Sequence, residues 1–130
     1  MNLPQNKEHR YLVTASDFAS FHGNVIHKVC STYALTREFE WVGRLVLLPL
    51  LQLEEEGIGT CAHIDHLAPA FEGEEMLFKA TPRPWNEGEE LIVDIEAFVG
   101  DRKIAKGFTG QRILPKAIIQ KIFDKAKATN

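Results

Sequence analysis

The sequence predicts a single α+β domain, in which an antiparallel sheet of about five strands surrounds one long central helix and a short helix follows. Apolar residues recur at helical spacing within residues 36–53, and the period changes to two after Gly57. Helical spacing returns in residues 115–126. A helix that is apolar on most of its sides must be buried, and one sheet can bury it.

The long helix is expected over residues 36–53, TREFEWVGRLVLLPLLQL. Thr36 is the expected N-cap, because a threonine hydroxyl accepts a hydrogen bond from the first helical turn. Pro49 lacks a backbone N–H, so we expect a kink or a stop near it. The helical face consists of Leu35, Phe39, Val42, Val46, Leu47 and Leu50.

Five strands are expected around this helix. The first covers residues 8–14, and residues 15–28 are expected to be loop or short helical turns. The other four cover residues 58–67, 74–82, 89–99 and 103–114. Turns at Glu72-Gly73, Glu87-Gly88 and Gly100-Asp101 favour an antiparallel meander.

A short C-terminal helix is expected over residues 115–126. Pro115 suits position N1, where its missing N–H costs nothing. One face of this helix carries Ile118, Ile119, Ile122 and Phe123.

The composition is that of one globular domain over residues 1–130, with 45% hydrophobic and 25% charged residues. A net charge of -3 gives no general attraction to nucleic acid or an anionic membrane. The longest apolar-rich run, residues 45–53, is too short to span a bilayer. Cys30 and Cys61 form no CxxC motif; reduced thiols are expected, with one disulfide as the alternative. The first 13 residues lack the apolar run of a signal peptide, and a cytoplasmic location is predicted.

The stretch CAHIDH, residues 61–66, places two histidines and an aspartate close together. A metal site would need His63 and His66 on one side of the chain. They are three apart in a predicted strand, where such residues point to opposite faces. No further Cys/His pair stands at zinc-ligand spacing. We therefore expect no metal site.

Strand parity separates the members of this stretch. His66 shares a face with Ala62 and Ile64, so it is expected to point inward, whereas His63 and Asp65 are expected to face solvent. A buried histidine is more often structural than catalytic.

Two polar residues could assist His66. Glu40 is either half of an exposed i,i+4 pair with Arg44 or a carboxylate able to orient an imidazole. Thr32 is either a capping residue or a hydroxyl at a reaction site. Gly59 is either a strand bulge or a point where a ligand approaches the backbone.

Together these residues resemble a known family. The long helix followed by antiparallel strands resembles the hotdog fold, and residues 29–69 resemble the fluoroacetyl-CoA thioesterase family. That family has a Thr-Glu-His triad, matched here by Thr32, by Glu40 in a Glu-Trp pair, and by His66 after Gly59-Thr60. The later stretch GFTGQRIL resembles the last strand and matches Arg112 to a family arginine.

The resemblance implies hydrolysis of a small or medium acyl-CoA thioester by this triad at a homodimer interface. Coenzyme A enters as part of the substrate, and no other cofactor is implied. Backbone N–H groups from about Ala34 to Phe39 would bind the oxyanion. The family's lid phenylalanine is replaced in the stretch that holds Gly23 and Ile26. Ile26, Gly59 and Arg112 are therefore expected substrate contacts, and thioester hydrolysis is implied rather than preference for a fluorinated acyl group.

Two other functions remain open. A hotdog hydratase or dehydratase would act at Cα and Cβ of an acyl-CoA, and a non-catalytic domain would only bind acyl-CoA or a small ligand. The sequence also leaves open whether Thr32 is acylated or positions water, which acyl group is used, and whether the oligomer is larger than a dimer.

Overall fold

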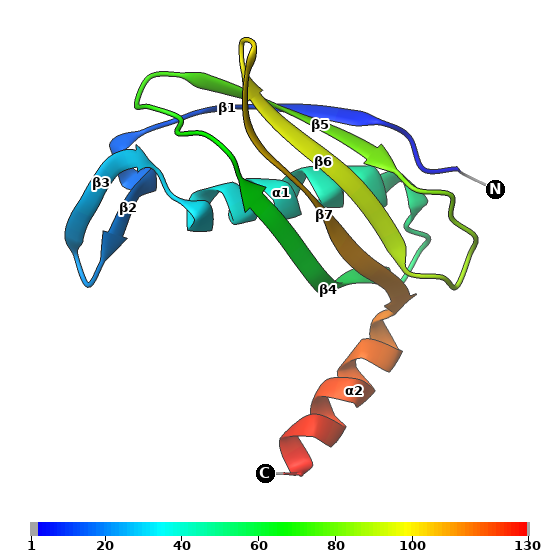
Figure 1. Cartoon of the computed structure of the whole chain (residues 1–130). Helices are drawn as coiled ribbons and strands as arrows, with labels where there is room; N and C mark the ends of the chain where they lie inside the picture. Colours follow the sequence, from blue (N-terminus) through cyan, green and yellow to red (C-terminus); the bar gives the residue numbers. More distant parts are fainter. Residues whose placement is uncertain (1–2, 130) are drawn as a thin grey trace.

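A five-stranded antiparallel sheet arches over helix α1 in this computed structural model, which describes residues 3–129 (Figure 1). The sheet confirms the predicted α+β class. Its strands are β1 (Lys7–Leu12), β4 (Glu55–His66), β5 (Glu75–Pro82), β6 (Leu91–Val99) and β7 (Arg102–Pro115). The remaining elements are η1 (Ala15–Asp17), β2 (Phe18–Phe21), β3 (Asn24–Cys30), α1 (Thr32–Leu47), η2 (Leu48–Leu50) and α2 (Lys116–Ala128).

Helix α1 begins four residues earlier than predicted. Its N-cap is Ser31, whose hydroxyl accepts a hydrogen bond from the Ala34 N–H at 2.9 Å. Thr36 is therefore not the cap; it lies inside the helix, and its hydroxyl donates to the Thr32 carbonyl at 2.8 Å. The prediction was wrong because Thr32 and Thr36 are poor helix formers that resemble the residues before a helix.

Both proline predictions concern helix ends. The α-helix stops at Leu47 and tightens into the 3-10 turn η2 that contains Pro49, which confirms the expected stop. Pro115 is the N-cap of α2 rather than its first residue. Within residues 3–129, no helix is both long and apolar enough to cross a bilayer.

The order of strands in the sheet is β1-β5-β6-β7-β4. Strands β5, β6 and β7 form the expected meander, and Gly73, Gly88 and Gly100 adopt positive φ at the expected turns. The prediction was wrong at β4, because β4 pairs with β7 and not with β5. After β4 the chain crosses to β5, which lies between β1 and β6 near the opposite edge of the sheet. In the described part of the chain, strand β4 pairs only with β7 and is therefore an edge strand.

Residues 18–30 form a β-hairpin that the sequence prediction missed. Strands β2 and β3 pair around a two-residue turn, in which His22 has φ 51° and Gly23 has φ 81°. Two successive positive φ angles are the requirement of a type I′ hairpin turn. Figure 1 shows this hairpin projecting beyond one end of α1.

The core lies between one face of α1 and the sheet. Phe39 and Phe78 meet edge to face with ring centroids 5.9 Å apart, and both are fully buried. The opposite face of α1 is open, and it exposes Tyr33 and Trp41. The sheet therefore buries one side of α1, as predicted, but the expectation that most sides of the helix are buried was wrong. The buried side of α1 consists of Ala34, Leu35, Glu38, Phe39, Val42, Gly43, Val46 and Leu47.

Gly43 lets α1 approach β7 closely. A Cβ atom on Gly43 would lie 2.5 Å from the Thr109 hydroxyl, and the Gln111 side chain donates to the Gly43 carbonyl at 3.0 Å. The Thr109 hydroxyl is buried and has no hydrogen-bond partner among the described residues. Only hydrogen is small enough for this contact.

Arg44 and Glu56 join the end of α1 to the start of β4. The two guanidinium N–H groups donate to the two carboxylate oxygens at 2.9 and 3.2 Å. The pKa of Glu56 falls to about 2, first because of Arg44 and then because the Gly57 N–H also donates to the carboxylate.

We predict that Gly43→Ala destabilises the fold by about 1–3 kcal/mol, because the new methyl group overpacks the helix–sheet contact. In the Thr109→Ala background the close atom is gone. The same substitution should then stabilise the fold by up to about 1 kcal/mol, since alanine is the better helix former. Urea denaturation of the four proteins of this double-mutant cycle measures both values. Equal effects of Gly43→Ala in the two backgrounds would contradict the contact.

We also predict that Glu56 stabilises the fold in a pH-dependent way. Its pKa is depressed in the folded chain, so the contribution is complete above the unfolded value near 4.5 and is lost as pH falls toward 2. The stability difference between wild type and Glu56→Gln should be constant above pH 5 and shrink below it in urea denaturation. Glu8→Gln, at an exposed residue without a hydrogen-bonded partner among the described residues, is the control and should show no such loss.

Candidate functional site

Thr32 and His66 meet at the N-terminal end of α1. The Thr32 hydroxyl lies 2.9 Å from His66 Nδ1, although the two residues are 34 positions apart. Thr32 is the first residue of α1, and His66 is the last residue of β4. The hydroxyl can donate to Nδ1 when the imidazole carries its proton on Nε2. This pair is the arrangement that a histidine base and a hydroxyl nucleophile require.

Strand β4 sorts residues 63–66 as predicted, but Ala62, which was expected on the inward face, is exposed. His66 and Ile64 are half-buried, whereas His63 and Asp65 have side chains 56% and 49% exposed. His63 stacks on Phe108 with ring centroids 5.5 Å apart. Within residues 3–129, no group of three His, Cys, Asp or Glu side chains is placed to hold a metal ion. His66 is therefore the histidine of this stretch that reaches the helix end.

The N-terminus of α1 supplies positive electrostatic potential beside this pair. The Ala34 N–H is bound by the Ser31 hydroxyl, and the Leu35 N–H by the Ser31 carbonyl at 3.1 Å. The N–H groups that open the helix belong to Thr32 and Tyr33, and such groups lack intrahelical acceptors. The helix starts earlier than expected, at Thr32, so its N-terminus precedes the expected oxyanion region from Ala34 to Phe39, and that region stays a prediction.

A cavity of about 560 Å³ opens beside Thr32. Aromatic and small residues from the hairpin side form one wall, and the first turns of α1 form the other. The sequence prediction missed these residues because it read residues 15–28 as loop. The lining consists of Ser16, Phe18, Ala19, Ser20, Phe21, Ser31, Thr32, Tyr33, Ala34 and Arg37.

An ionic network centred on the buried Asp17 and the exposed Arg37 supports the wall of this cavity. Asp17, which is only 2% exposed, accepts hydrogen bonds from the Tyr11 hydroxyl at 2.7 and 2.8 Å and from Arg37 at 3.1 Å. Arg37 also donates to Glu38 at 2.7 Å, and Glu38 contacts His9 Nε2 at 2.8 Å. The network ties β1 and η1 to α1, so it fixes the helix end that carries Thr32.

The pKa values reflect this pairing. Burial acts to raise the pKa of Asp17, but hydrogen bonds from the Thr14 N–H, Tyr11 and Arg37 lower it overall. The pKa of Arg37 is raised, first by its hydrogen bond to Glu38. Burial raises the pKa of the neighbouring Cys30 thiol to about 11, which makes it a poor nucleophile. Asp17 and Arg37 are therefore a charged structural pair.

Glu40 lies apart from Thr32 and His66 in the same chain. Eight residues of α-helix separate Glu40 from Thr32, which is about 12 Å along the axis. Glu40 is exposed and has no hydrogen-bond or ion-pair partner among the described residues. Among the described residues, Arg44 binds Glu56, so the alternative ion pair between Glu40 and Arg44 is not formed.

Glu40 instead borders a small cavity of about 170 Å³ between α1, β4 and β7. Gly59 and Cys61 of β4 line it, together with Thr109 and Gln111 of β7. Gly59 lies beside a bulge in β4, and a Cβ atom there would meet nothing within 4 Å. The open backbone at Gly59 therefore faces the same space as the Glu40 carboxylate.

The other expected substrate contacts lie elsewhere. Ile26 is exposed on β3 and is not among the residues that line the 560 Å³ cavity. Arg112 is exposed beside Gln111, whose side chain turns inward, so Arg112 points to the outer face of the sheet. Gly23 occupies the hairpin turn at positive φ, where a larger side chain would be strained.

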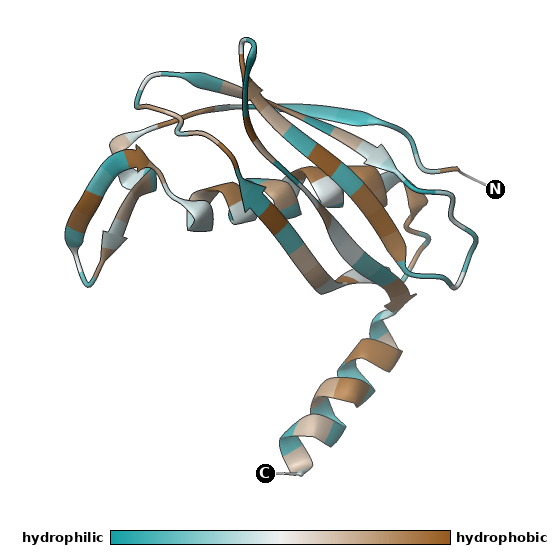
Figure 2. Cartoon of the chain, viewed as in Figure 1, coloured by the Kyte–Doolittle hydropathy of each residue, from teal (hydrophilic) through white to brown (hydrophobic). Residues whose placement is uncertain are grey.

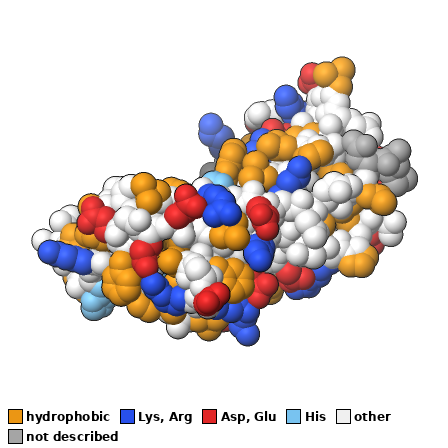
Figure 3. Space-filling view, turned by 90° about the horizontal axis from the view of Figure 1, so that it is seen from above, with side chains coloured by type: hydrophobic (Ala, Val, Ile, Leu, Met, Phe, Trp, Pro, Cys, Tyr) orange, Lys and Arg blue, Asp and Glu red, His pale blue; other side chains and the backbone are white. Residues whose placement is uncertain are grey.

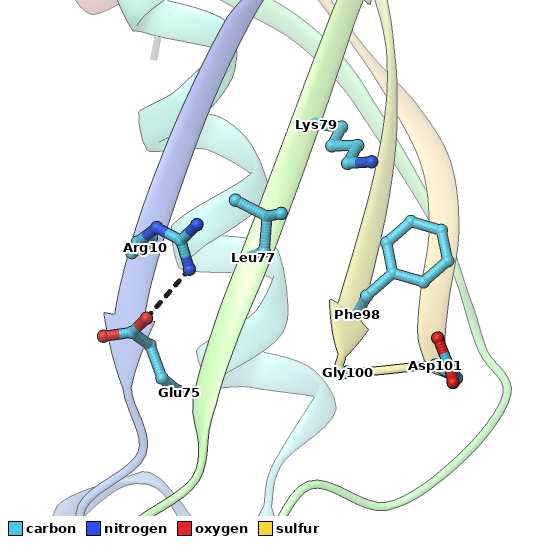
Figure 4. Close-up of a pocket in the computed structure, with 7 residues that line it drawn as sticks. All are labelled: Arg10, Glu75, Leu77, Lys79, Phe98, Gly100 and Asp101. Atoms are coloured by element: carbon cyan, nitrogen blue, oxygen red, sulfur yellow. Dashed lines mark hydrogen bonds and ion pairs between the residues drawn. The ribbon is translucent and has the colours of Figure 1, made fainter.

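The outer face of the sheet carries mixed charges (Figure 3). A cavity of about 380 Å³ lies there, away from α1 (Figure 4). Arg10 and Glu75 form an exposed ion pair at 3.0 Å in its wall, and the Lys79 ammonium lies 5.6 Å from the Phe98 ring centroid. This cavity contains no histidine or hydroxyl pair like that of Thr32 and His66.

Comparisons with known proteins agree with this architecture. The pattern that defines the family named fluoroacetyl-CoA-specific thioesterase matches residues 13–117. A Thermus thermophilus hypothetical protein, described as a thioesterase superfamily member, is 30% identical with a TM-score of 0.89. The match covers 97% of this chain and 93% of that one. A comparison with curated proteins finds no significant match.

Two further structures share the fold at lower identity. A mutant of the fluoroacetyl-CoA-specific thioesterase, in complex with fluoroacetate and CoA, is 20% identical with a TM-score of 0.80. That match covers 92% of this chain and 99% of the other. A hot-dog-like protein from Thermanaerovibrio acidaminovorans is 18% identical with a TM-score of 0.84, and 95% and 90% of the two chains are covered. The fold is thus hotdog-like, and the chain belongs to the fluoroacetyl-CoA-specific thioesterase family of the thioesterase superfamily.

Proposed function

We propose that the protein hydrolyses a small or medium acyl-CoA thioester. The observation that carries the proposal is the 2.9 Å contact between Thr32 Oγ1 and His66 Nδ1 at the start of α1, beside the 560 Å³ cavity. Family membership supports thioester chemistry, and the solved relatives include complexes with CoA and fluoroacetate and with acetyl-CoA.

In the proposed reaction, His66 removes a proton from the Thr32 hydroxyl or from a water molecule as that oxygen attacks the thioester carbonyl. The developing oxyanion is stabilised by the free N–H groups at the N-terminus of α1. The C–S bond then breaks, and the CoA sulfur leaves with the proton that the imidazolium held. If Thr32 is acylated, water completes the cycle by hydrolysing the ester. Either route needs no metal ion or further cofactor.

We assign the third member of the triad, Glu40, to a second copy of the chain. Strand β4 is the edge of the sheet, so its outer N–H and C=O groups are available for pairing. Glu40 borders the cavity near Gly59 and Cys61, whereas His66 ends the same strand. If two β4 edges pair antiparallel with the two-fold axis near His63, Gly59 of one chain lies near His66 of the other. Glu40 of one chain can then accept a hydrogen bond from His66 Nε2 of the other.

The proposed acyl group is apolar and larger than fluoroacetyl. The cavity beside Thr32 holds about 560 Å³, and Phe18, Phe21 and Ala34 contribute to its apolar lining. Gly23 and Ile26 stand in the stretch where the family's lid carries phenylalanine. We therefore expect fluoroacetyl-CoA to have no advantage over other short acyl-CoAs.

Thiol release from a panel of acyl-CoAs tests the proposed function. The panel should contain fluoroacetyl, acetyl, branched, aromatic and hydroxylated acyl groups, with an enoyl-CoA to detect hydration. Release of free CoA supports the proposal. Hydration of the enoyl-CoA without thiol release would indicate a hydratase. Calorimetric binding of CoA without turnover would indicate a binding domain.

We predict that His66→Ala lowers kcat/KM by about 10²–10⁴-fold, because a general base contributes about that factor. Thr32→Val should cause a similar loss, whereas Thr32→Ser keeps the hydroxyl and should retain more activity. The measurement is steady-state thiol release with the best acyl-CoA of the panel.

His63→Ala is the matched control, because His63 is an exposed histidine three residues before His66. It should stay within about twofold of wild type, as surface substitutions usually do. Near-wild-type turnover by His66→Ala on every acyl-CoA that wild type hydrolyses would contradict the role of His66.

A further inference from the structure

Helix α2 leaves the domain with an apolar face that no residue from 3 to 129 covers. None of its residues is buried, and Phe123 is 52% exposed. Ile118 and Ile122 are also exposed and share one face by their i,i+4 spacing. Figure 2 shows hydrophobic segments, in brown, along α2. The ammonium groups of four lysines keep the rest of the α2 surface in water. They belong to Lys116, Lys121, Lys125 and Lys127.

A second apolar surface lies on the β2–β3 hairpin. Phe21 is 70% exposed there, and Val25 and Ile26 are also exposed. Tyr33 lines the same cavity as Phe21, and Trp41 is exposed two turns further along α1. Exposed apolar groups gathered in this way mark an interaction site. In Figure 1 the hairpin and α2 extend below α1 near its two ends, so α2 does not reach the hairpin of its own chain.

Backbone hydrogen bonds attach these two surfaces to opposite ends of β4. The Lys116 N–H donates to the Glu54 carbonyl at 2.8 Å, which holds the start of α2 at the start of β4. The Cys30 N–H donates to the Ala70 carbonyl at 2.8 Å, which holds the end of β3 just beyond the end of β4. Strand β4 therefore separates α2 from the hairpin within one chain.

We propose that α2 of one chain packs its apolar face on the β2–β3 hairpin and the adjoining open face of α1 of a second copy. The inference rests on the two-fold pairing of β4 in the proposed function. Antiparallel pairing places the start of each β4 next to the end of the other, so each α2 meets the hairpin of the other chain. The occupant is a second copy because α2 and the hairpin are each attached at an end of β4, the edge strand through which the copies pair.

This contact gives α2 a role in the reaction site. The hairpin side forms one wall of the cavity beside Thr32, through Phe18, Ala19, Ser20 and Phe21. Few contacts join the hairpin to the rest of its own chain, chiefly to η1 and the start of α1. A helix from the second copy seated on the hairpin would hold that wall in place over Thr32.

Cysteine cross-linking between two differently tagged chains tests the contact. Both chains carry Cys61→Ser, because Cys61 is exposed, while Cys30 is buried and can stay. One chain carries Ile122→Cys, and the other carries Val25→Cys or Ile26→Cys, since neighbouring strand residues face opposite ways. The chains are mixed, allowed to exchange, and oxidised. A disulfide between the two tags is expected for one of the two hairpin positions.

Asp124→Cys is the matched control. Asp124 lies two residues after Ile122, about 200° further round α2 at 3.6 residues per turn. The Ile122→Cys chain should cross-link about tenfold faster than the Asp124→Cys chain, because a disulfide needs Cβ atoms about 4 Å apart. No cross-link, equal rates for the two positions, or a monomer by light scattering would overturn the proposal. Binding of monomeric chain to anionic lipid vesicles through α2 would overturn it in favour of a membrane surface.

Thiol release by the wild-type protein separates this inference from the proposed function. Hydrolysis without the cross-link would overturn the α2 contact and leave the function standing. The cross-link without hydrolysis would support the contact and remove the function.

Discussion

The structure depends on the one-sided packing of α1 against the sheet. Gly43 brings the helix so close to β7 that a single methyl group would collide with the Thr109 hydroxyl. This contact and the aromatic pair Phe39–Phe78 set the distance between α1 and the sheet. The end of β4 then falls beside the first turn of α1, where His66 meets Thr32. The same packing leaves the other face of α1 open, and it is this open face that we assign to a second copy.

Much of the fold could be predicted from periodicity, because apolar spacing distinguishes a helix from a strand. The strands at β5, β6 and β7 and their glycine turns followed from this signal. The β2–β3 hairpin did not, because its turn carries His22 rather than the usual Asn or Asp before Gly23. The position of β4 at the edge could not be predicted either, because strand pairing depends on tertiary contacts that spacing does not encode.

The candidate site, like the fold, could be predicted only in part from the sequence. Strand parity separated His66 from His63 and Asp65, since side-chain direction alternates wherever the strand is regular. The contact with Thr32 was reached only through family resemblance, because 34 residues separate the two side chains. The network around Asp17 and Arg37 carried no sequence signal, because its members are ordinary polar residues that only the fold brings together. Glu40 remains a prediction, and its distance along α1 is the reason that we place it across an interface.

Complementation between two inactive chains tests this account most directly. A Glu40→Gln chain and a His66→Gln chain, which we expect to be inactive alone, are mixed in equal amounts and allowed to exchange. If each site takes Glu40 from one copy and His66 from the other, half of the dimers are mixed and each has one intact site. The mixture should then recover about a quarter of wild-type thiol release, given random pairing of two-fold dimers. If all three residues act within one chain, no intact site can form, and a mixture as inactive as its components would contradict the account.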